Sequence, residues 1–260
     1  MGIENRTVVV PTLSELRRLR EEGQAIGYQG IHIYLRYRAI LQTLAGMNFT
    51  RVLGVGAGFG IFDRLLPPAI EYVGIDVDPH AVALASTWSA FHRPQWRYYA
   101  TPLGECNFPT DHFDLVFVSE VIEHIYEPDV AAMLAEVHRV LIPGGYLLLS
   151  VPNHLHLRNR VRRLLGRGTV WMDPTHLREY TLREALALVQ SLRFRQRAFR
   201  PAVLYFPCEA WLARVIPPES DWRRRVIAIL PQVASHFIFL LQKENPDGAA
   251  KLMHRHAGVQ

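Results

Sequence analysis

The sequence predicts an α/β protein with a doubly wound, mostly parallel sheet and helices on both of its faces. Between residues 51 and 151, short apolar segments typical of strands alternate with segments whose apolar residues recur at helical spacing. The first strand leads into a glycine-rich turn at residues 54–60, and the second ends in an acid, Asp76. A chain that alternates in this way buries a parallel sheet between two layers of helices.

The expected elements follow in a regular order. Strands are expected at about residues 51–55, 72–77, 96–100, 113–119, 146–151, 194–199 and 235–243. Helices are expected at about residues 59–66, 79–91, 128–141 and from 182 onward. The last of these follows Thr181, which forms a capping box with Glu184. Ligands of such sheets bind beyond the carboxyl ends of the strands, so the loops at that edge contain the candidate site.

Composition is that of an ordinary globular protein, with 49% apolar and 20% charged residues in 260. The net charge is +5, and much of the excess is arginine within residues 158–225, for which a solvated basic face is the preferred explanation. Residues 226–242 are uncharged over 17 positions, but Pro231 favours a helix end, a turn and a strand over a membrane span. With no signal peptide and two cysteines, the expected location is cytoplasmic.

The glycine turn is the first candidate ligand site. Gly56, Gly58 and Gly60 follow the apolar strand, and glycine permits positive φ angles and close approach of the backbone to a ligand. A helix beginning after the turn would add free N–H groups that favour an anionic ligand. Asp76 lies 16 positions after Gly60, near the spacing of about 20 at which an acid reaches a ribose diol. Together these features predict a cofactor that contains adenosine.

Four motifs in this order resemble those of the class I S-adenosylmethionine-dependent methyltransferases. They are residues 52–60, 73–79, 113–124 and 139–152, and the resemblance covers roughly residues 40–200. The chain is similar to the type 11 and type 23 methyltransferases, and its E-V-I-E-H segment resembles that of the quinone-pathway O-methyltransferases. The resemblance implies a Rossmann-like sheet of seven strands whose last strand is antiparallel. The G-x-G-x-G spacing disfavours the alternative of a nicotinamide dehydrogenase.

The resemblance also divides the chain. Residues 1–45 would form an N-terminal helical cap, and residues 46–260 the methyltransferase domain. Within that domain we expect a lid at about 153–176 and an insertion of two helical pieces at about 201–234. The cap would cover the cofactor, with Arg36 or Arg38 near its methionine carboxylate and Tyr28 or Tyr34 closing the pocket.

The cofactor implied is S-adenosyl-L-methionine. The residues expected to bind it are Gly56, Ala57, Gly58, Asp76, Val77, Leu103, Ser119 and Glu120. Asp76 would bind the ribose hydroxyls, and Val77 and Leu103 would pack around adenine. The sequence departs from the family at Gly54, where an acid is usual, and after the third strand, where Glu105 is the first acid available. These departures keep a non-catalytic, methyltransferase-like scaffold open as an alternative.

Two histidines are candidate bases, because a hydroxyl acceptor must lose a proton during methyl transfer. His124 follows the fourth strand, and His176 follows the lid. If helical, Glu120, Glu123 and His124 would share one face. In the quinone-pathway enzymes that this segment resembles, it is associated with a divalent metal; here we expect no metal.

We therefore expect an S-adenosylmethionine-dependent methyltransferase that acts on an oxygen of a small molecule. A lipid-like compound and a glycan precursor are the candidate acceptors. The main alternative is an RNA methyltransferase that binds phosphates through the arginine-rich lid, although the chain has no RNA-recognition signature. Contact of the helical insertion with a membrane surface also stays open.

Overall fold

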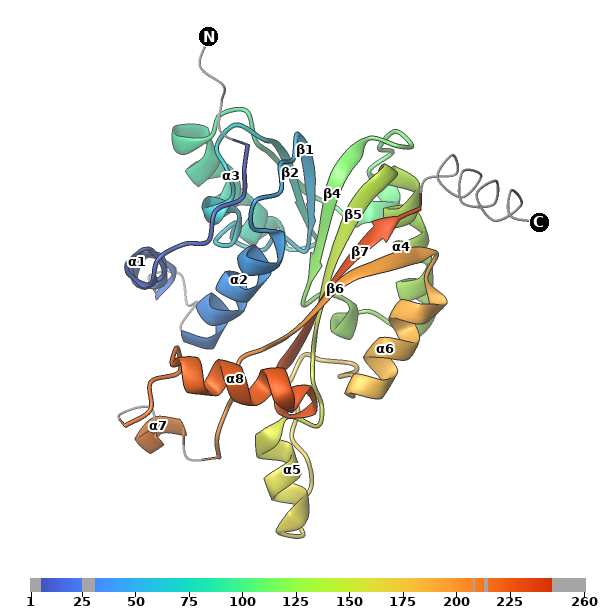
Figure 1. Cartoon of the computed structure of the whole chain (residues 1–260). Helices are drawn as coiled ribbons and strands as arrows, with labels where there is room; N and C mark the ends of the chain where they lie inside the picture. The colour runs from blue at the N-terminus through green and yellow to red at the C-terminus, as the bar shows by residue number, and fades with distance from the viewer. Residues whose placement is uncertain (1–5, 25–30, 208, 213–214, 245–260) are drawn as a thin grey trace, which may run out of the picture.

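The computed structural model describes residues 6–24, 31–207, 209–212 and 215–244. Its centre is a seven-stranded sheet in the order β3-β2-β1-β4-β5-β7-β6 (Figure 1). The strands are β1 (Arg51–Val55), β2 (Glu71–Asp76), β3 (Arg97–Ala100), β4 (Phe113–Ser119), β5 (Leu141–Pro152), β6 (Phe194–Ala202) and β7 (His236–Lys243). β7 runs antiparallel to both of its neighbours, and the other pairs are parallel. The predicted fold class, including the antiparallel last strand, is therefore confirmed.

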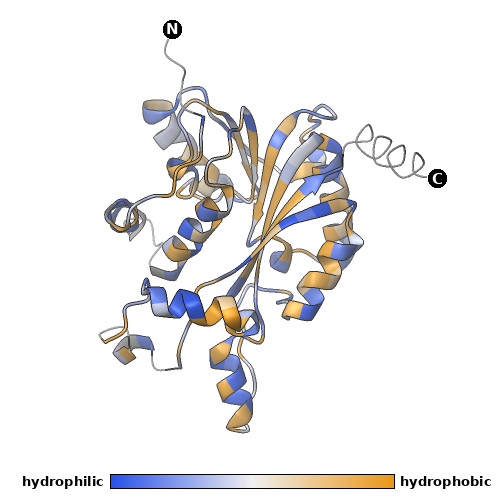
Figure 2. Cartoon of the chain, viewed as in Figure 1, coloured by the Kyte–Doolittle hydropathy of each residue, from blue (hydrophilic) through white to orange (hydrophobic). Residues whose placement is uncertain are grey.

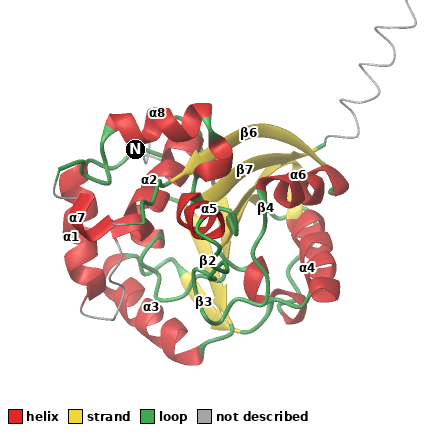
Figure 3. Cartoon of the chain, turned by 90° about the horizontal axis from the view of Figure 1, so that it is seen from below, coloured by secondary structure: helices red, strands yellow, loops and turns green. Residues whose placement is uncertain are grey.

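Helices cover both faces of this sheet (Figure 3). They are α1 (Leu13–Gln24), α2 (Ile31–Leu44), α3 (Pro79–His92), α4 (Glu127–Val140), α5 (Leu157–Leu164), α6 (Leu182–Ser191), α7 (Glu209–Leu212) and α8 (Asp221–Ile229). Neighbouring strand residues such as Val52 and Leu53 point to opposite faces. Leu53 belongs to a core with apolar residues of α4 and α6, and Val52 to a core with those of α2 and α3. Thr181 caps α6 in the predicted capping box with Glu184.

The prediction of a helix at residues 59–66 is wrong. That segment consists of turns and one 3-10 turn, η1 (Asp63–Leu65). Gly56, Gly58 and Gly60 have φ angles of +70°, +52° and +68°, which are incompatible with a right-handed helix, and Pro67 follows too soon for one to form. The loop backbone, and not a helix N-terminus, therefore forms the wall of the predicted cradle.

The lid and the insertion lie beyond the carboxyl edge of β5 (Figure 1). The segment expected to form a lid contains α5, and the segment expected to form an insertion contains α7 with Trp211 and α8 with Trp222. Figure 2 shows the strands of the sheet largely hydrophobic and α5 striped with polar and apolar residues. The uncharged segment 226–242 is the end of α8, a 3-10 turn and β7, and the described residues contain no helix long and apolar enough to cross a membrane. Tyr28 and the chain after residue 244 lie outside the described residues.

Candidate active site

The glycine loop after β1 lies against the loop after β4 at the carboxyl edge of the sheet. A Cβ atom placed on Gly56 would lie 2.4 Å from the Cγ2 atom of Val121, so only glycine fits there. A Cβ placed on Gly58 would meet no atom within 4 Å, so this glycine borders open space. The first glycine therefore permits contact between the two loops, and the second leaves room for a ligand at the backbone.

Asp76, at the end of β2, supports the glycine loop. Its Oδ2 atom accepts a hydrogen bond of 2.7 Å from the Gly58 N–H, and its Oδ1 atom accepts one of 3.0 Å from the Asp78 N–H. Each carboxylate oxygen has two acceptor positions, so one on each oxygen remains for a diol. The next residue, Val77, is 73% exposed and offers an apolar surface beside that carboxylate.

Tyrosine and a buried acid take the place of the missing acid at Gly54. A Cβ at Gly54 would lie 2.0 Å from the Tyr72 hydroxyl, so the tyrosine occupies the space beside this glycine. The carboxylate of Asp63, which is 3% exposed, accepts a hydrogen bond of 3.0 Å from the Tyr98 hydroxyl. Burial raises the pKa of Asp63 to about 7, although Tyr72 and Tyr98 act to lower it. The loop thus has a buried carboxyl group beneath it, contributed by η1 and not by β1.

Glu120 is held in a buried ion-pair network. It has a φ of +57°, and its carboxylate lies 3.1 Å from Arg36 Nη1, 3.3 Å from His236 Nε2 and 2.7 Å from Ser150 Oγ. Burial acts to raise the pKa of Glu120, but the Arg36 and His236 charges more than offset it and hold this pKa far below its usual range. Ser119 is bonded to the same serine, with the two hydroxyl oxygens 2.9 Å apart. Glu120 therefore belongs to a different group of contacts from Glu123 and His124, the other two members of the E-x-x-E-H segment.

The remaining cofactor and cap candidates are found in several places. Ala57 is half-buried in the glycine loop, and Leu103 is buried in the core beneath the carboxyl edge. Glu105 is exposed, with one hydrogen bond of 3.4 Å from Thr101. Tyr34 is buried among apolar residues of α1 and α2, and Arg38 lies outside the site, in a cavity bordered by β6 and α8.

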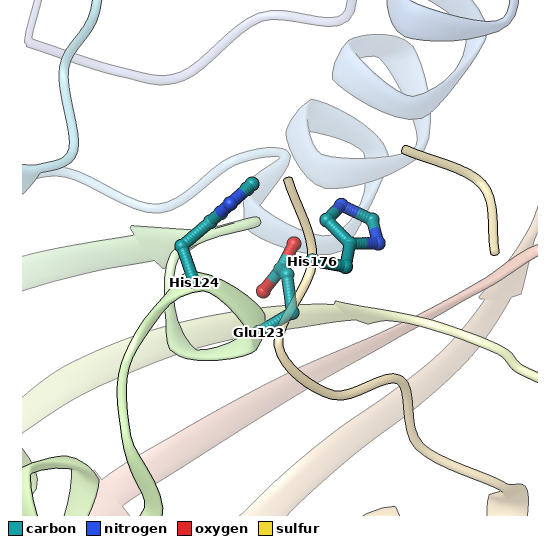
Figure 4. A group of neighbouring side chains, drawn as sticks. All are labelled: Glu123, His124 and His176. Atoms are coloured by element: carbon teal, nitrogen blue, oxygen red, sulfur yellow. The ribbon is translucent and has the colours of Figure 1, made fainter. Parts of the chain in front are cut away.

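The two candidate bases, His124 and His176, come together. Their ring centroids are 4.8 Å apart, and the rings are nearly perpendicular (Figure 4). His124 is exposed in the 3-10 turn η3 (Ile122–His124), with its Nδ1 atom 3.3 Å from the Thr175 hydroxyl. His176 is only 9% exposed, and its Nδ1 atom lies 2.9 Å from the Oε1 atom of Glu179. An imidazole oriented by a buried carboxylate is the arrangement of a general base.

Backbone hydrogen bonds hold the segment that returns from the lid. The N–H groups of Leu177 and Arg178 donate to the Glu123 carbonyl oxygen at 2.7 and 3.2 Å. The Tyr180 N–H donates to the Pro152 carbonyl oxygen at 3.2 Å. His176 is thereby fixed between η3 and the end of β5, although it lies 52 positions after His124 in the chain.

Glu123 lies between the two histidines in Figure 4. It has no exposure, and neither carboxylate oxygen has a hydrogen-bond partner among the described residues. Burial, with the charge of Glu120, raises its pKa well above the usual range, so the neutral acid is favoured. Ligand atoms of Glu123, His124 and His176 lie within 4.8 Å of one another, a set that a divalent ion could use after displacing that proton. Our expectation of no metal remains a prediction.

Comparison with known proteins supports the resemblance seen in the sequence motifs. Residues 53–149 match the family model of a methyltransferase domain. This segment, which is less than half of the chain, is thus similar to the class I S-adenosylmethionine-dependent methyltransferases that the motifs predict. S-adenosyl-L-methionine is the cofactor of that family, as the sequence motifs predicted.

Curated relatives carry the same type of domain. A probable S-adenosylmethionine-dependent methyltransferase of Mycolicibacterium smegmatis is 31% identical over 61% of this chain and 56% of its own length. A ubiquinone biosynthesis O-methyltransferase of a Bradyrhizobium species is 30% identical over 58% of this chain and 62% of its own length. The chain thus spans about six tenths of the lengths of these two relatives. Among solved structures, a putative methyltransferase of Bacillus halodurans has a TM-score of 0.57 at 18% identity, covering 80% of this chain and 99% of that one, which supports the fold.

Sequence reasoning missed several site residues. Glu179 stands three positions after His176, a spacing that could have suggested a pair, but the segment was interpreted only as the entry to a helix. Asp63 gave no signal, because it lies in a segment expected to be a helix. The contact of His236 with Glu120 joins β7 to the loop after β4, and no sequence pattern indicates it.

Proposed function

We propose that this protein transfers a methyl group from S-adenosylmethionine to an oxygen atom of a small molecule. The observation that carries the proposal is the pair formed by His176 and the buried carboxylate of Glu179, at the edge of the sheet where the methyltransferase motifs end. A methyltransferase that acts on a hydroxyl needs one oriented base, and this pair supplies it. The His176–Glu179 pair is the reason for preferring oxygen as the acceptor atom.

The residues at the glycine loop fit the cofactor. Gly58 borders open space, Asp76 retains free acceptor positions, and Val77 presents an exposed apolar surface. In this proposal Asp76 binds the ribose hydroxyls, Val77 packs on adenine, and the backbone at Gly56 and Gly58 borders the methionine part. When bound, S-adenosylmethionine supplies an electrophilic methyl group on its sulfonium.

The role of the chain in the reaction is to hold the acceptor and to accept its proton. Burial acts to raise the pKa of Glu179, but hydrogen bonds from His176 and from the Met172 N–H more than offset it and lower that pKa. The carboxylate therefore accepts the proton on His176 Nδ1, which leaves Nε2 as the basic nitrogen. In our proposal this nitrogen takes the hydroxyl proton as the methyl group is transferred.

The proposed acceptor class rests on one relative and on the lid. The relative from Bradyrhizobium is named as an O-methyltransferase of ubiquinone biosynthesis, although about four tenths of its length lies outside the match. The lid has an exposed apolar tip, since Leu164 is 87% and Leu165 66% exposed, and these side chains could contact a lipid-like acceptor or a membrane surface. A lipid-like acceptor is therefore preferred to a glycan precursor.

An RNA acceptor is the second candidate, because α5 carries four arginines and no acid. Two of the four already bind the protein: the Nε atoms of Arg160 and Arg162 donate to backbone carbonyl oxygens. Arg158 and Arg163 are exposed. RNA binding that weakens steeply with salt would support this candidate.

Calorimetric titration with S-adenosylmethionine and S-adenosylhomocysteine tests the cofactor site. We expect micromolar binding that Asp76→Ala weakens at least about tenfold, because the variant loses both the ribose contacts and the bond to Gly58. The control is Asp78→Ala, which removes a cap of α3 but no proposed ligand contact. Absence of binding by the wild-type chain would leave the non-catalytic scaffold as the better explanation.

Acceptor screening with wild type and His176→Ala tests the chemistry. We expect methylated oxygen in the product of a phenolic or lipid-like acceptor, and a large loss of rate in the variant with unchanged cofactor affinity. A product methylated on nitrogen, or an RNA product, would overturn the acceptor assignment while leaving the cofactor site intact.

A further inference from the structure

A cavity of about 430 Å³ lies between α2, β6 and α8, apart from the residues assigned to the methyl-transfer site. In both Figure 1 and Figure 3, α2 and α8 lie beside β6. The lining of this cavity includes no residue of the glycine loop and no member of the Glu123, His124 and His176 cluster. The volume is in the range of small-molecule sites. A second ligand could therefore be accommodated in this part of the fold.

Apolar and cationic groups line the cavity together. Leu35 and Ala39 of α2, Phe199 and Ala202 of β6, and Ile227 of α8 contribute apolar surface. Three arginines, one from each of these elements, face the same space: Arg38, Arg200 and Arg224. Such a lining suits a ligand that has both an apolar body and a negative group.

The charges of the cavity are incompletely compensated. Arg224 is paired with Asp221, and Arg223, a fourth lining arginine, is paired with Glu209 at 2.8 Å. Arg38 and Arg200 have no carboxylate partner among the residues that the structure describes. Glu219 is the only carboxylate in the lining as described, and it lies 3.4 Å from Arg17. Two cations thus remain for a ligand.

One of these arginines is held by the protein, and the other has unused hydrogen-bonding capacity. The Nε atom of Arg200 donates to the Thr43 hydroxyl at 3.0 Å, which fixes the plane of the guanidinium group. The Nε atom of Arg38 is buried and has no hydrogen-bond partner among the described residues. Burial lowers the pKa of each guanidinium, and the charge of Arg224 lowers both further, as expected for like charges that face one another.

Arg38 cannot serve the methyl-transfer site at the same time. Arg36, two positions earlier on α2, binds Glu120 at the edge of that site. Residues two apart on a helix are separated by about 200° around its axis, so the two side chains leave α2 in nearly opposite directions. The same helix therefore borders the active site on one side and the cavity on the other.

We propose that the cavity between α2, β6 and α8 binds a phosphate group carried by an apolar body, with Arg38 and Arg200 as its main contacts. Two guanidinium groups balance the two charges of a phosphate monoester, and each can donate two parallel hydrogen bonds. The apolar walls then contact the body of the ligand. The phosphate could belong to a soluble phosphate ester or to a membrane lipid, and the chemistry of recognition is the same for both.

The test is calorimetric titration of the full chain with hexyl phosphate, inorganic phosphate and hexanol. We expect hexyl phosphate to bind at least about tenfold more tightly than inorganic phosphate, and hexanol not to bind measurably. Arg38→Gln combined with Arg200→Gln should weaken hexyl phosphate binding at least about tenfold. The matched control is Arg195→Gln, an exposed arginine of β6 outside the cavity.

Thermal unfolding separates a binding defect from a folding defect. Without ligand, the double variant should be at least as stable as wild type, because like charges have been removed; only wild type should gain stability from hexyl phosphate. Equal affinity in wild type and double variant, or displacement of hexyl phosphate by S-adenosylhomocysteine, would overturn the proposal. Both results are independent of whether methyl transfer is ever observed.

Vesicle sedimentation identifies the source of the phosphate. Retention on vesicles of phosphatidic acid in phosphatidylcholine, lost in the double variant and reversed by hexyl phosphate, assigns the cavity to a lipid headgroup. Binding of soluble hexyl phosphate without such retention assigns it to a soluble phosphate ester. Retention that the double variant keeps in full shows that vesicles bind elsewhere, and the lipid source is then rejected.

Discussion

His176 and Glu179 form a pair in which the Nδ1 atom of the histidine lies 2.9 Å from a carboxylate with no solvent exposure. The carboxylate also accepts a hydrogen bond from the Met172 N–H, and its other oxygen lies 3.4 Å from His154 Nδ1. Contacts on three sides fix Glu179, and Glu179 in turn fixes the tautomer of His176. The ring is therefore held with one nitrogen as a donor and the other available to accept a proton.

The first prediction concerns this carboxylate. Glu179→Gln should lower the rate of methyl transfer roughly 100-fold or more, because the amide no longer favours the tautomer in which Nε2 is basic. The affinity for S-adenosylhomocysteine should not change, since Glu179 is not among the proposed cofactor contacts. The measurement is single-turnover methylation together with calorimetry. Glu127→Gln, at an exposed acid that also contacts the returning segment through Arg178, is the matched control; full activity in Glu179→Gln would contradict the assignment.

The second prediction ranks the two histidines. His176→Ala should cost more rate than His124→Ala, because His124 is exposed and its ring is bonded, among the described residues, only to the Thr175 hydroxyl at 3.3 Å. We expect a loss of about tenfold for His124→Ala and of ~100-fold or more for His176→Ala. The reverse order would make His124 the base. A metal-binding cluster would give a different result. His124→Ala, His176→Ala and Glu123→Gln would then lose the same amount of rate, a chelator would lower the rate of wild type equally, and a divalent ion would restore the rate of the chelated enzyme.

The central strands β1, β2, β4 and β5 could be predicted because each contains a short apolar run bounded by glycine, proline or an acid, and those signals depend on neighbouring residues alone. The helix at residues 59–66 was a wrong prediction for a local reason as well. Its apolar pattern was helical, but Gly60 lies inside the segment with a positive φ, and Pro67 leaves few residues after it for a helix. Weighting the glycines above the periodicity would have given the correct result.

The site could be predicted only in part, because its residues are brought together by tertiary contacts. Each histidine was recognisable as a base that follows a strand or a lid. The hydrogen bonds that join residues 177 and 178 to the Glu123 carbonyl, and so bring the histidines together, have no sequence signature. The same holds for the Arg36, Glu120 and His236 network, which joins α2, the loop after β4 and β7.

The third prediction concerns the glycine that stands where the family has an acid. Gly54→Ala should lower the free energy of unfolding by about 1–3 kcal/mol, because the new Cβ would lie 2.0 Å from the Tyr72 hydroxyl. Gly54→Asp, which restores the family residue, should cost at least as much. Combining Gly54→Ala with Tyr72→Phe should recover part of the loss, since the contacting oxygen is gone. Denaturant unfolding measures wild type, Gly54→Ala, Gly54→Asp, Tyr72→Phe and the double variant; additive effects in the double variant would contradict the contact.

The last prediction is a pH dependence of stability at Asp63. Burial raises the pKa of this carboxyl to about 7, whereas its unfolded value is the ordinary 3.8. Between about pH 4 and pH 7 the folded chain therefore keeps a proton that the unfolded chain has lost. The contribution of Asp63 to the free energy of unfolding must then fall as pH rises through this window, and above pH 7 the full penalty of a buried charge remains.

Asp63→Asn removes that penalty and keeps an acceptor for the Tyr98 hydroxyl. At pH 5 the variant should already be more stable than wild type by roughly 2 kcal/mol, because the unfolded wild-type chain has lost the proton there, and at pH 8 the difference should be on the order of 4 kcal/mol. His32 and His156 change the free energy of unfolding in the opposite direction. Burial lowers the pKa of each to about 4, so the unfolded chain takes up protons at these groups as the pH falls below about 6.5, and stability falls with pH. The informative quantity is therefore the difference between variant and wild type in urea unfolding at the two pH values, with exposed Asp129→Asn as the control. A difference that stays constant from pH 5 to pH 8 would mean that Asp63 is ionised throughout, and that the tyrosines beneath the glycine loop solvate its charge.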